Sequence, residues 1–475
     1  MKNQLLCILG LSLLLISCHE KVQEESSLDG VWASVGYGRV VHIENGAYTL
    51  SDITEISCIP LMEGEISDFG DALQLKNDTL SLKDGINFYF FTRVQETPAV
   101  CNTESAEYKT AQARINDPEF NFEVMWKTFD DHYAYFQLRK IDWDHMYKKY
   151  RPMITSRTSE VELYRIMDEM LEAFNDGHIG LSAPDEIEEA AYAMLPKEEN
   201  TAKEPKEELR NYKVARVVAQ QYIPNGKSLK NGQLRWGTIE GNIGYLQVNQ
   251  MMGMADYEIS DTLSYRDYWM AYFERLEESS DTTRDELAGM NNALDQIMMD
   301  LETTDALIID VRFNGGGKDE VGMALLNRLN PEEKVVFTKK GRLGNGFTPV
   351  IEVVQTASKD PYSKPVYLLI SSESASATEI MTLSSLSLDH ITRIGSNTEG
   401  VFSDILDKTL PNGWEIDLSS EVYESMEGTN YEGIGIPPDV EIGYPRDTQE
   451  FLSKVLEDLN HTGDAAIERA LELLK

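Results

Sequence analysis

The sequence predicts a protein of the α/β class with a small antiparallel β domain in front of its main core. Over residues 233–446, apolar strand-like runs such as "ALIIDVRF" and "VYLLI" alternate with helix-patterned segments. Strands that are apolar at every position are typical of a sheet covered by helices on both faces. Residues 28–105 instead hold short alternating segments separated by "ENG" and "KDG", which favour hairpin turns. With 475 residues, 41% of them hydrophobic, the chain can bury a large core.

The first residues predict export. "MKNQLLCILGLSLLLISC" (1–18) has one lysine and an apolar run too short for a comfortable membrane span, then small residues before Cys18. "LISC" resembles a bacterial lipobox, which implies cleavage before Cys18 and lipidation of that residue. Residues 19–27 would then be a tether. We expect a protein that is lipid-anchored to the bacterial cell envelope, at the inner or the outer membrane; a plain secretory signal cut elsewhere is the alternative.

The charge and the cysteine content indicate which ligands and cross-links to expect. The net charge of −38 is spread along the chain, which disfavours binding to nucleic acid. The sequence has no H-E-x-x-H and no paired-cysteine spacing, so we expect no metal and no cofactor. In an oxidising compartment Cys58 and Cys101 could form a disulfide, but the sequence does not show whether they come within bridging distance.

Residues 106–185 follow a helical pattern. The clearest helix has apolar residues on one face (Leu163, Ile166, Met167, Met170, Leu171 and Phe174). It stops at "NDG" (175–177), and His178 follows immediately, before the strand-like "IGLS". Residues 186–232 are polar and charged, which predicts an exposed insertion or linker. Another helix is expected through Leu287 to Leu301, and an amphipathic helical tail over 447–475.

Two motifs in the core carry candidate chemistry. "SSESASATEI" joins a strand to a helix, and Ser376 begins the S-x-x-E spacing of a capping box. Ser376 is therefore either a helix cap or a nucleophile beside the free N–H groups of a helix N-terminus. In "DVRFNGGG", a buried strand runs into three glycines, which indicates either a plain turn or a backbone that approaches a substrate closely.

Four segments in order resemble the C-terminal processing (tail-specific) serine peptidase family. They are "FDDHYAYFQLRKIDWDHMYKKYRP" with "MLEAFNDGHIGL", "LIIDVRFNGGG", "SSESASATEI" and "NYEGIGIPPDVEI". The resemblance covers about residues 118–445 and leaves the β domain outside. It implies a crotonase/ClpP-like peptidase core that cleaves extended or unfolded polypeptides, in some members near their C-termini.

The resemblance also assigns residues. One branch of the family uses a lysine base in a segment similar to Gly395–Phe402, where this chain has Val401. The tricorn-like branch uses Ser, His and Glu, which match Ser376, His178 and Glu432 here. In that reading His178 is the base and Glu432 fixes its tautomer, with Glu399 and Glu379 as alternative carboxylates.

The oxyanion hole would then consist of the Ala377 amide with that of Gly316 or Gly317. The segment between His178 and Ile243 is too short and polar for a PDZ module. A protein of the same fold that only carries hydrophobic ligands or peptides is the alternative to a peptidase.

Overall fold

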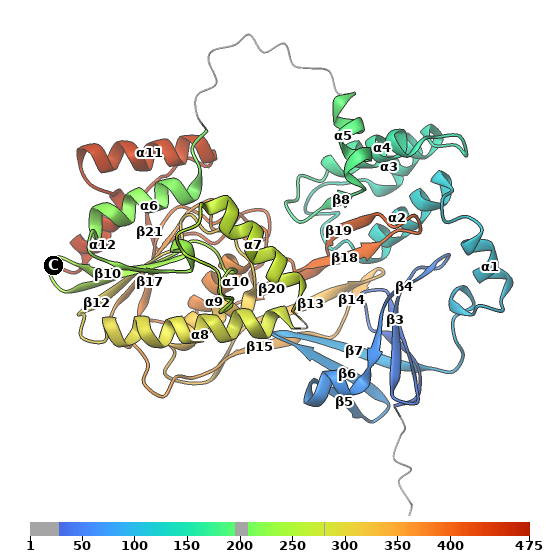
Figure 1. Cartoon of the computed structure of the whole chain (residues 1–475), viewed down its shortest axis with the longest axis horizontal. Helices are drawn as coiled ribbons and strands as arrows, with labels where there is room; N and C mark the ends of the chain where they lie inside the picture. Colours follow the sequence, from blue (N-terminus) through green and yellow to red (C-terminus); the bar gives the residue numbers. More distant parts are fainter. Residues whose placement is uncertain (1–27, 195–207, 280) are drawn as a thin grey trace, which may run out of the picture.

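The computed structural model describes residues 28–194, 208–279 and 281–475. In Figure 1 the α/β core lies on one side and the β domain and helical segment lie on the other. Cys18 and the other residues of the signal and the tether lie outside the described residues. Within the described part of the chain, no helix is both long and apolar enough to cross a bilayer.

The N-terminal β domain is one antiparallel sheet in the order β4-β3-β2-β1-β7-β6-β5. Its strands are short, as the turn-rich sequence predicts: β1 (Gly30–Ser34), β2 (Arg39–Glu44), β3 (Ala47–Ile53), β4 (Cys58–Glu65), β5 (Leu73–Lys76), β6 (Thr79–Asp84) and β7 (Asn87–Val94). Trp32 is fully buried at its centre. A disulfide joins Cys58 to Cys101, which confirms the pairing that the sequence left open and ties the sheet to the segment after it.

The helical segment contains α1 (Ala106–Gln112), α2 (Pro118–His132), α3 (Trp143–Tyr150), α4 (Glu160–Glu172) and α5 (Asp185–Ala193). The predicted helix is α4. It begins with a capping box at Ser159, and the chain then turns through Asn175, whose φ is 50°. The helix thus ends where the "NDG" signal predicts.

The core is a sheet in the order β21-β17-β16-β12-β11-β10-β9. Its strands are β9 (Lys227–Leu229), β10 (Leu234–Ile239), β11 (Ile243–Val248), β12 (Ala306–Asp310), β16 (Val366–Ile370), β17 (Ile391–Gly395) and β21 (Val440–Glu441). From β11 to β21 neighbouring strands are parallel. Their carboxyl ends therefore meet at one edge, which is where open α/β sheets place their sites.

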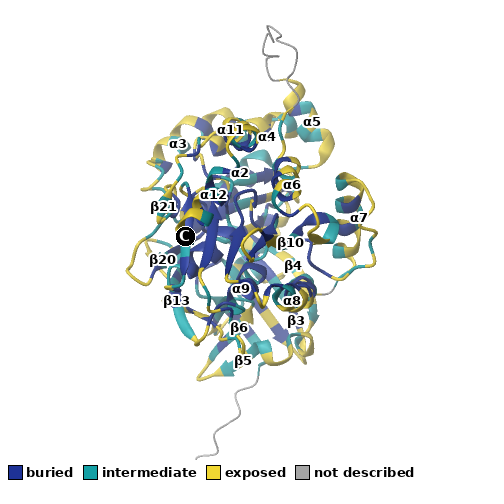
Figure 2. Cartoon of the chain, turned by 90° about the vertical axis from the view of Figure 1, so that its left-hand side faces the viewer, coloured by how far each residue is buried: buried dark blue, intermediate teal, exposed yellow. Residues whose placement is uncertain are grey.

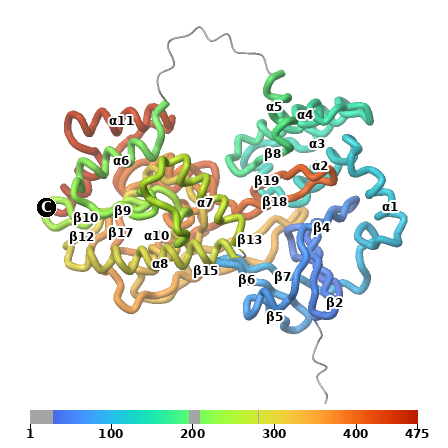
Figure 3. The backbone as a smooth tube through the Cα atoms, in the orientation of Figure 1, coloured from blue at the N-terminus to red at the C-terminus, as the bar shows by residue number. Residues whose placement is uncertain are grey.

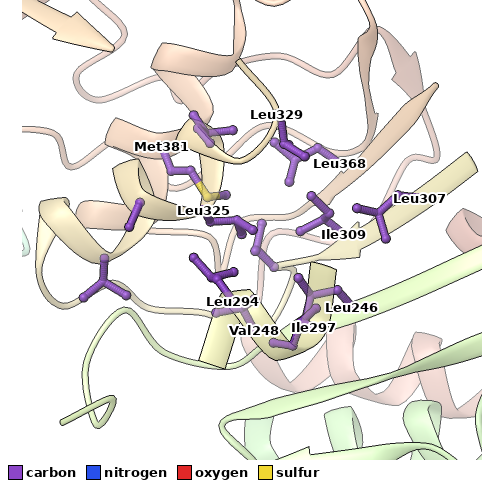
Figure 4. Close-up of a cluster of buried hydrophobic side chains, with 14 of the residues drawn as sticks. Leu246, Val248, Leu294, Ile297, Leu307, Ile309, Leu325, Leu329, Leu368 and Met381 are labelled. Carbon is purple, nitrogen blue, oxygen red and sulfur yellow. The ribbon is translucent and has the colours of Figure 1, made fainter. Parts of the chain in front are cut away.

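Helices cover both faces of this sheet, as predicted. One face packs against α8 (Thr282–Leu301), α9 (Asp319–Asn327) and α10 (Ala377–Ser385). Figure 4 shows this cluster, in which Leu294 and Ile297 of α8 lie near Leu246 of β11. The other face packs against α6 (Asn211–Tyr222), α11 (Thr448–His461) and α12 (Ala465–Leu473). In Figure 2 the sheet appears dark blue, enclosed by half-exposed helices.

The position of α6 corrects one prediction. We expected residues 186–232 to be an exposed insertion or linker, but α6 packs on the core sheet through Val214, Ala215, Val218 and Ala219, all nearly fully buried. The described core therefore begins with α6, and α5 belongs to the helical segment. Residues 195–207, the most charged part of the predicted linker, lie outside the described residues.

Two smaller sheets join the core to the N-terminal half. One contains β13 (Lys334–Leu343), β14 (Gly346–Phe347), β15 (Ile351–Gln355) and β20 (Glu421–Ser425). The other pairs the hairpin of β18 (Ile405–Thr409) and β19 (Glu415–Ser419) with β8 (Gly180–Ser182). In Figure 3 the green β8 lies beside the red β18 and β19, although they are far apart in sequence. Because β8 begins two residues after His178, this pairing places the histidine motif against the core.

Candidate active site

The serine-rich turn after β16 is held by its own hydroxyl groups. The Ser371 and Ser374 hydroxyls donate to the carbonyl oxygens of Arg312 (2.6 Å) and Val311 (2.8 Å), just after β12. The Ser372 hydroxyl donates to the Arg446 carbonyl at 3.3 Å. Among the described residues, the Ser376 hydroxyl has no hydrogen-bond partner, so it is the serine in this turn whose oxygen is free to react.

Ser376 occupies a strained position at the start of α10. Its φ of 53° and ψ of −124° are unusual for a residue with a side chain, and such strain is concentrated at functional sites. The helix begins where we predicted, but the capping box is absent. Ser376 makes no side-chain cap bond, and the Glu379 carboxylate points elsewhere. The structure thus removes the helix-cap interpretation of Ser376.

The glycine run lies directly against Ser376. A Cβ atom on Gly316 would stand 2.8 Å from the Ser376 Cβ and 3.2 Å from the Ala377 nitrogen. The N–H groups of Ala377 and Gly317 have no acceptor among the described residues, whereas the Gly316 N–H donates to Asn314 Oδ1 at 3.0 Å. Of the two glycine amides that we considered for an oxyanion hole, that of Gly317 is the one left free.

His178 is oriented by a backbone carbonyl group. Its Nδ1 lies 2.6 Å from the Ser403 carbonyl oxygen, which can only accept, so Nδ1 carries the proton. Nε2 then has its lone pair free, and in the described structure nothing is bonded to it. Burial lowers the pKa of His178, while Asp176 and the Ser403 carbonyl raise it to a smaller extent. The imidazole is therefore neutral near pH 7 and can act as a base.

A short segment after β17 connects the serine and histidine motifs. Both Glu379 carboxylate oxygens accept backbone N–H groups at 2.7 Å, one from Gly400 and one from Val401. Glu379 lies on the first turn of α10, three residues after Ser376, and the connected segment continues to Ser403, which holds His178. Burial raises the pKa of Glu379 to about 8, partly offset by Thr398 and the two N–H groups. Glu379, which we considered as an alternative catalytic carboxylate, is thus a link between the two motifs.

Glu432 does not contact His178, contrary to our expectation. Its Oε1 accepts from the Arg139 guanidinium at 2.9 Å, and its Oε2 accepts from the Phe402 N–H at 2.8 Å. Burial raises the pKa of Glu432 to about 7, with a smaller contribution from Asp176 in the same direction. Phe402 and Arg139 act in the opposite direction. The carboxylate therefore acts on His178 indirectly, through the 402–403 backbone and through Arg139.

Arg139 and Asp176 are site residues that the sequence did not single out. The Asp176 carboxylate accepts from the Tyr133 hydroxyl (2.9 Å), the Ser419 hydroxyl (3.0 Å) and the His178 N–H (3.1 Å). These bonds join the helical segment, β19 and the histidine loop. Both residues lie in segments that resemble the family, but no local pattern distinguishes a buried ion pair from surface charges.

A cavity of about 550 Å³ lies between the two motifs. The histidine loop, the serine-rich turn and the 399–401 segment all line it. Its lining residues are Arg139, Asn175, Asp176, Gly177, Ser372, Glu373, Glu399, Gly400, Val401, Gly433, Arg446 and Thr448. The cavity is therefore built from segments that are nearly 200 positions apart in the chain, and it lies beside Ser376 and His178 without being lined by either.

Comparison with known families agrees with this geometry. Residues 242–442, which contain the glycine run, the serine-rich turn and Glu432, match peptidase family S41. Residues 242–442 are therefore a peptidase family S41 domain. Residues 116–172, which contain Arg139 and all of α2, α3 and α4, match the tricorn protease C1 domain. The resemblance to the C-terminal processing peptidases is thus confirmed, and the chain is a serine peptidase by family.

Solved structures support the fold. A putative peptidase from Parabacteroides merdae has a TM-score of 0.54 at 22% identity, and the alignment covers 75% of this chain and 96% of that protein. Mature CPAF has a TM-score of 0.49 at 10% identity, with 74% and 99% covered. The photosystem II D1 C-terminal processing protease has a TM-score of 0.40 at 12% identity, with 74% and 99% covered. The last two similarities are too low to carry an argument. No protein of curated function matches the sequence significantly.

Proposed function

We propose that this S41 peptidase hydrolyses peptide bonds with Ser376 as nucleophile and His178 as general base, through an acyl-enzyme. The observation that carries the proposal is the free Ser376 hydroxyl, on a strained residue that is followed by the unbonded Ala377 amide and packed against Gly316. A hydroxyl at neutral pH needs a base within reach, and the neutral His178 has its Nε2 free for this task.

The roles proposed for Ser376 and His178 define a sequence of proton transfers. His178 Nε2 accepts the Ser376 proton as Oγ attacks the scissile carbonyl carbon, and the amides stabilise the negative oxygen that forms. The imidazolium then protonates the leaving amine, and water releases the acyl group by the reverse path. The Ser403 carbonyl holds the Nδ1 proton throughout. Glu432 acts indirectly: it accepts a hydrogen bond from the Phe402 N–H and so holds the neighbouring residue Ser403, whose carbonyl group orients His178.

We propose that the substrate is an extended or unfolded polypeptide, and that the enzyme cleaves it near its C-terminus. The open cavity beside the serine-rich turn supports access for an extended chain. The disulfide supports a location outside the cytoplasm, because such bonds persist in oxidising compartments. We propose accordingly that Cys18 carries a lipid anchor at the cell envelope. A Cys18→Ser variant should be released to the soluble fraction or remain an unprocessed precursor.

A carrier of hydrophobic ligands on the same fold is the alternative function. A carrier needs neither the strained serine nor the oriented histidine, and the cavity is lined by charged residues. Labelling with a fluorophosphonate probe separates the two functions, because the probe mimics the tetrahedral intermediate. We expect modification at Ser376 that Ser376→Ala abolishes and His178→Ala strongly suppresses, with parallel loss of casein hydrolysis. A folded protein that shows neither labelling nor hydrolysis would favour the carrier function over the peptidase function.

A further inference from the structure

Arg139 connects the helical segment to both sides of the histidine site. It lies in the loop between α2 and α3, where its backbone N–H donates to the Tyr135 carbonyl at 2.9 Å. Its guanidinium donates to Glu432 at 2.9 Å and to the Asn175 carbonyl at 2.8 Å, and it lies 4.0 Å from the Asp176 carboxylate. These contacts use the fork of a guanidinium, which a lysine cannot reproduce.

Two routes lead from these contacts to the imidazole. The first passes through Asn175, three residues before His178 and the point where the chain turns after α4. The second passes through Glu432 to the Phe402 N–H, next to the Ser403 carbonyl that accepts from His178. Arg139 therefore fixes both the loop that carries the imidazole and the backbone that orients it.

The charges explain why a cation is needed here. The side chains of Asp176 and Glu432 are both fully buried, and Arg139, 13% exposed, forms ion pairs with both. Buried carboxylates without a cation take up protons or move towards water. Loss of Arg139 would then release Glu432 from the 402–403 backbone and Asn175 from its anchor.

We propose that Arg139 is a positioning residue for His178, so that the helical segment completes the active site by supplying a guanidinium clamp. The inference rests on the proposed peptidase function. It assigns to the segment matched by the tricorn C1 domain a role in catalysis that goes beyond packing. Arg139 itself touches neither the serine nor the base, and acts through Asn175 and Glu432.

The test uses the full chain, with labelled casein as substrate and the fluorophosphonate probe. We expect Arg139→Ala to lower kcat about 100-fold, the size expected for a misplaced catalytic group, with KM little changed. The kcat of Arg139→Lys should lie between those of Arg139→Ala and wild type, and millimolar guanidinium should raise the kcat of Arg139→Ala. Arg151 is the matched control, since it pairs with Glu119 and Glu123 in the same segment but away from the site. Arg151→Ala should unfold at lower urea concentration, keep its kcat and gain nothing from guanidinium.

Three outcomes would overturn the inference, and a fourth would refute the proposed function. A wild-type kcat in Arg139→Ala would overturn the inference. So would a loss that only follows the unfolded fraction, without rescue by guanidinium, since that is the behaviour of a structural residue. If Arg139→Ala does not fold, Arg139→Lys decides: a folded variant with wild-type kcat and labelling overturns the inference. Wild-type protein that neither labels nor hydrolyses casein would instead refute the proposed function itself.

Discussion

The three consecutive glycines at 315–317 should respond differently to alanine. Gly315 has a φ outside the left-handed region, and a Cβ there would meet nothing within 4 Å. Gly316 has a φ of 109°, and its Cβ would stand 2.8 Å from that of Ser376. Gly317 has a φ of 138°, and its Cβ would stand 2.5 Å from the backbone carbonyl carbon and oxygen of Met251.

These surroundings determine how much each substitution should change the free energy of unfolding. Gly315→Ala should change the free energy of unfolding by no more than about 0.5 kcal/mol, as surface substitutions do. Gly316→Ala adds a disfavoured φ, which costs roughly 1–2 kcal/mol. Gly317→Ala adds the same strain and a contact with backbone that cannot rotate away, so its total should reach about 2–5 kcal/mol.

Turnover should also separate Gly315→Ala from Gly316→Ala. Gly316→Ala pushes on Ser376 and should lower turnover by roughly 10- to 100-fold even where the protein is folded. Gly315→Ala should keep wild-type turnover. The assay is urea unfolding of each variant together with casein hydrolysis per folded molecule. Wild-type turnover in Gly316→Ala, or equal damage from Gly315→Ala, would refute this account of the glycine run.

Three further predictions concern the disulfide and two titrating groups. Replacing Cys58 and Cys101 by serine should lower the free energy of unfolding by about 4 kcal/mol, from the chain entropy of a loop that spans 43 residues; equal urea midpoints for variant and oxidised wild type would contradict it. Because burial lowers the pKa of His178, kcat/KM should fall on the acid side only below pH 6.5, the ordinary histidine value; an acid limb above that value would count against His178 as base. The pKa of Glu432 is raised from 4.5 to about 7 in the folded state. The folded protein therefore binds this proton more tightly than the unfolded chain does, which stabilises the fold fully below pH 4.5, and this stabilisation is lost as pH rises through 7. The unfolding free energy of wild type should therefore fall relative to that of Glu432→Gln over this window, and a constant difference would show that Glu432 does not titrate there.

Local patterns were enough to predict the α/β core, the end of α4 and the loops that carry the serine-rich turn and the glycine run, whereas the family resemblance singled out Ser376 and His178. Each depends on neighbours in sequence: fully apolar strands, an "NDG" stop, and a loop that directly follows a strand. Because β12 and β16 are adjacent and parallel, the loops after them meet at one edge, so motifs read separately along the chain belong to one site. The disulfide pairing depended on distance and stayed open until the structure placed both cysteines.

Only the tertiary structure decided what the charged and hydroxyl groups bind. Which serine is free depends on the carbonyl oxygens of Val311 and Arg312, about 60 residues upstream of the turn. Glu432 pairs with Arg139, 293 positions away, and leaves the orientation of His178 to a backbone carbonyl. Long polar side chains can reach many partners, and burial selects among them, because a buried charge or donor without a partner is costly. That selection is made by elements remote in sequence, so local patterns specify where the reactive groups lie, and packing specifies what holds them.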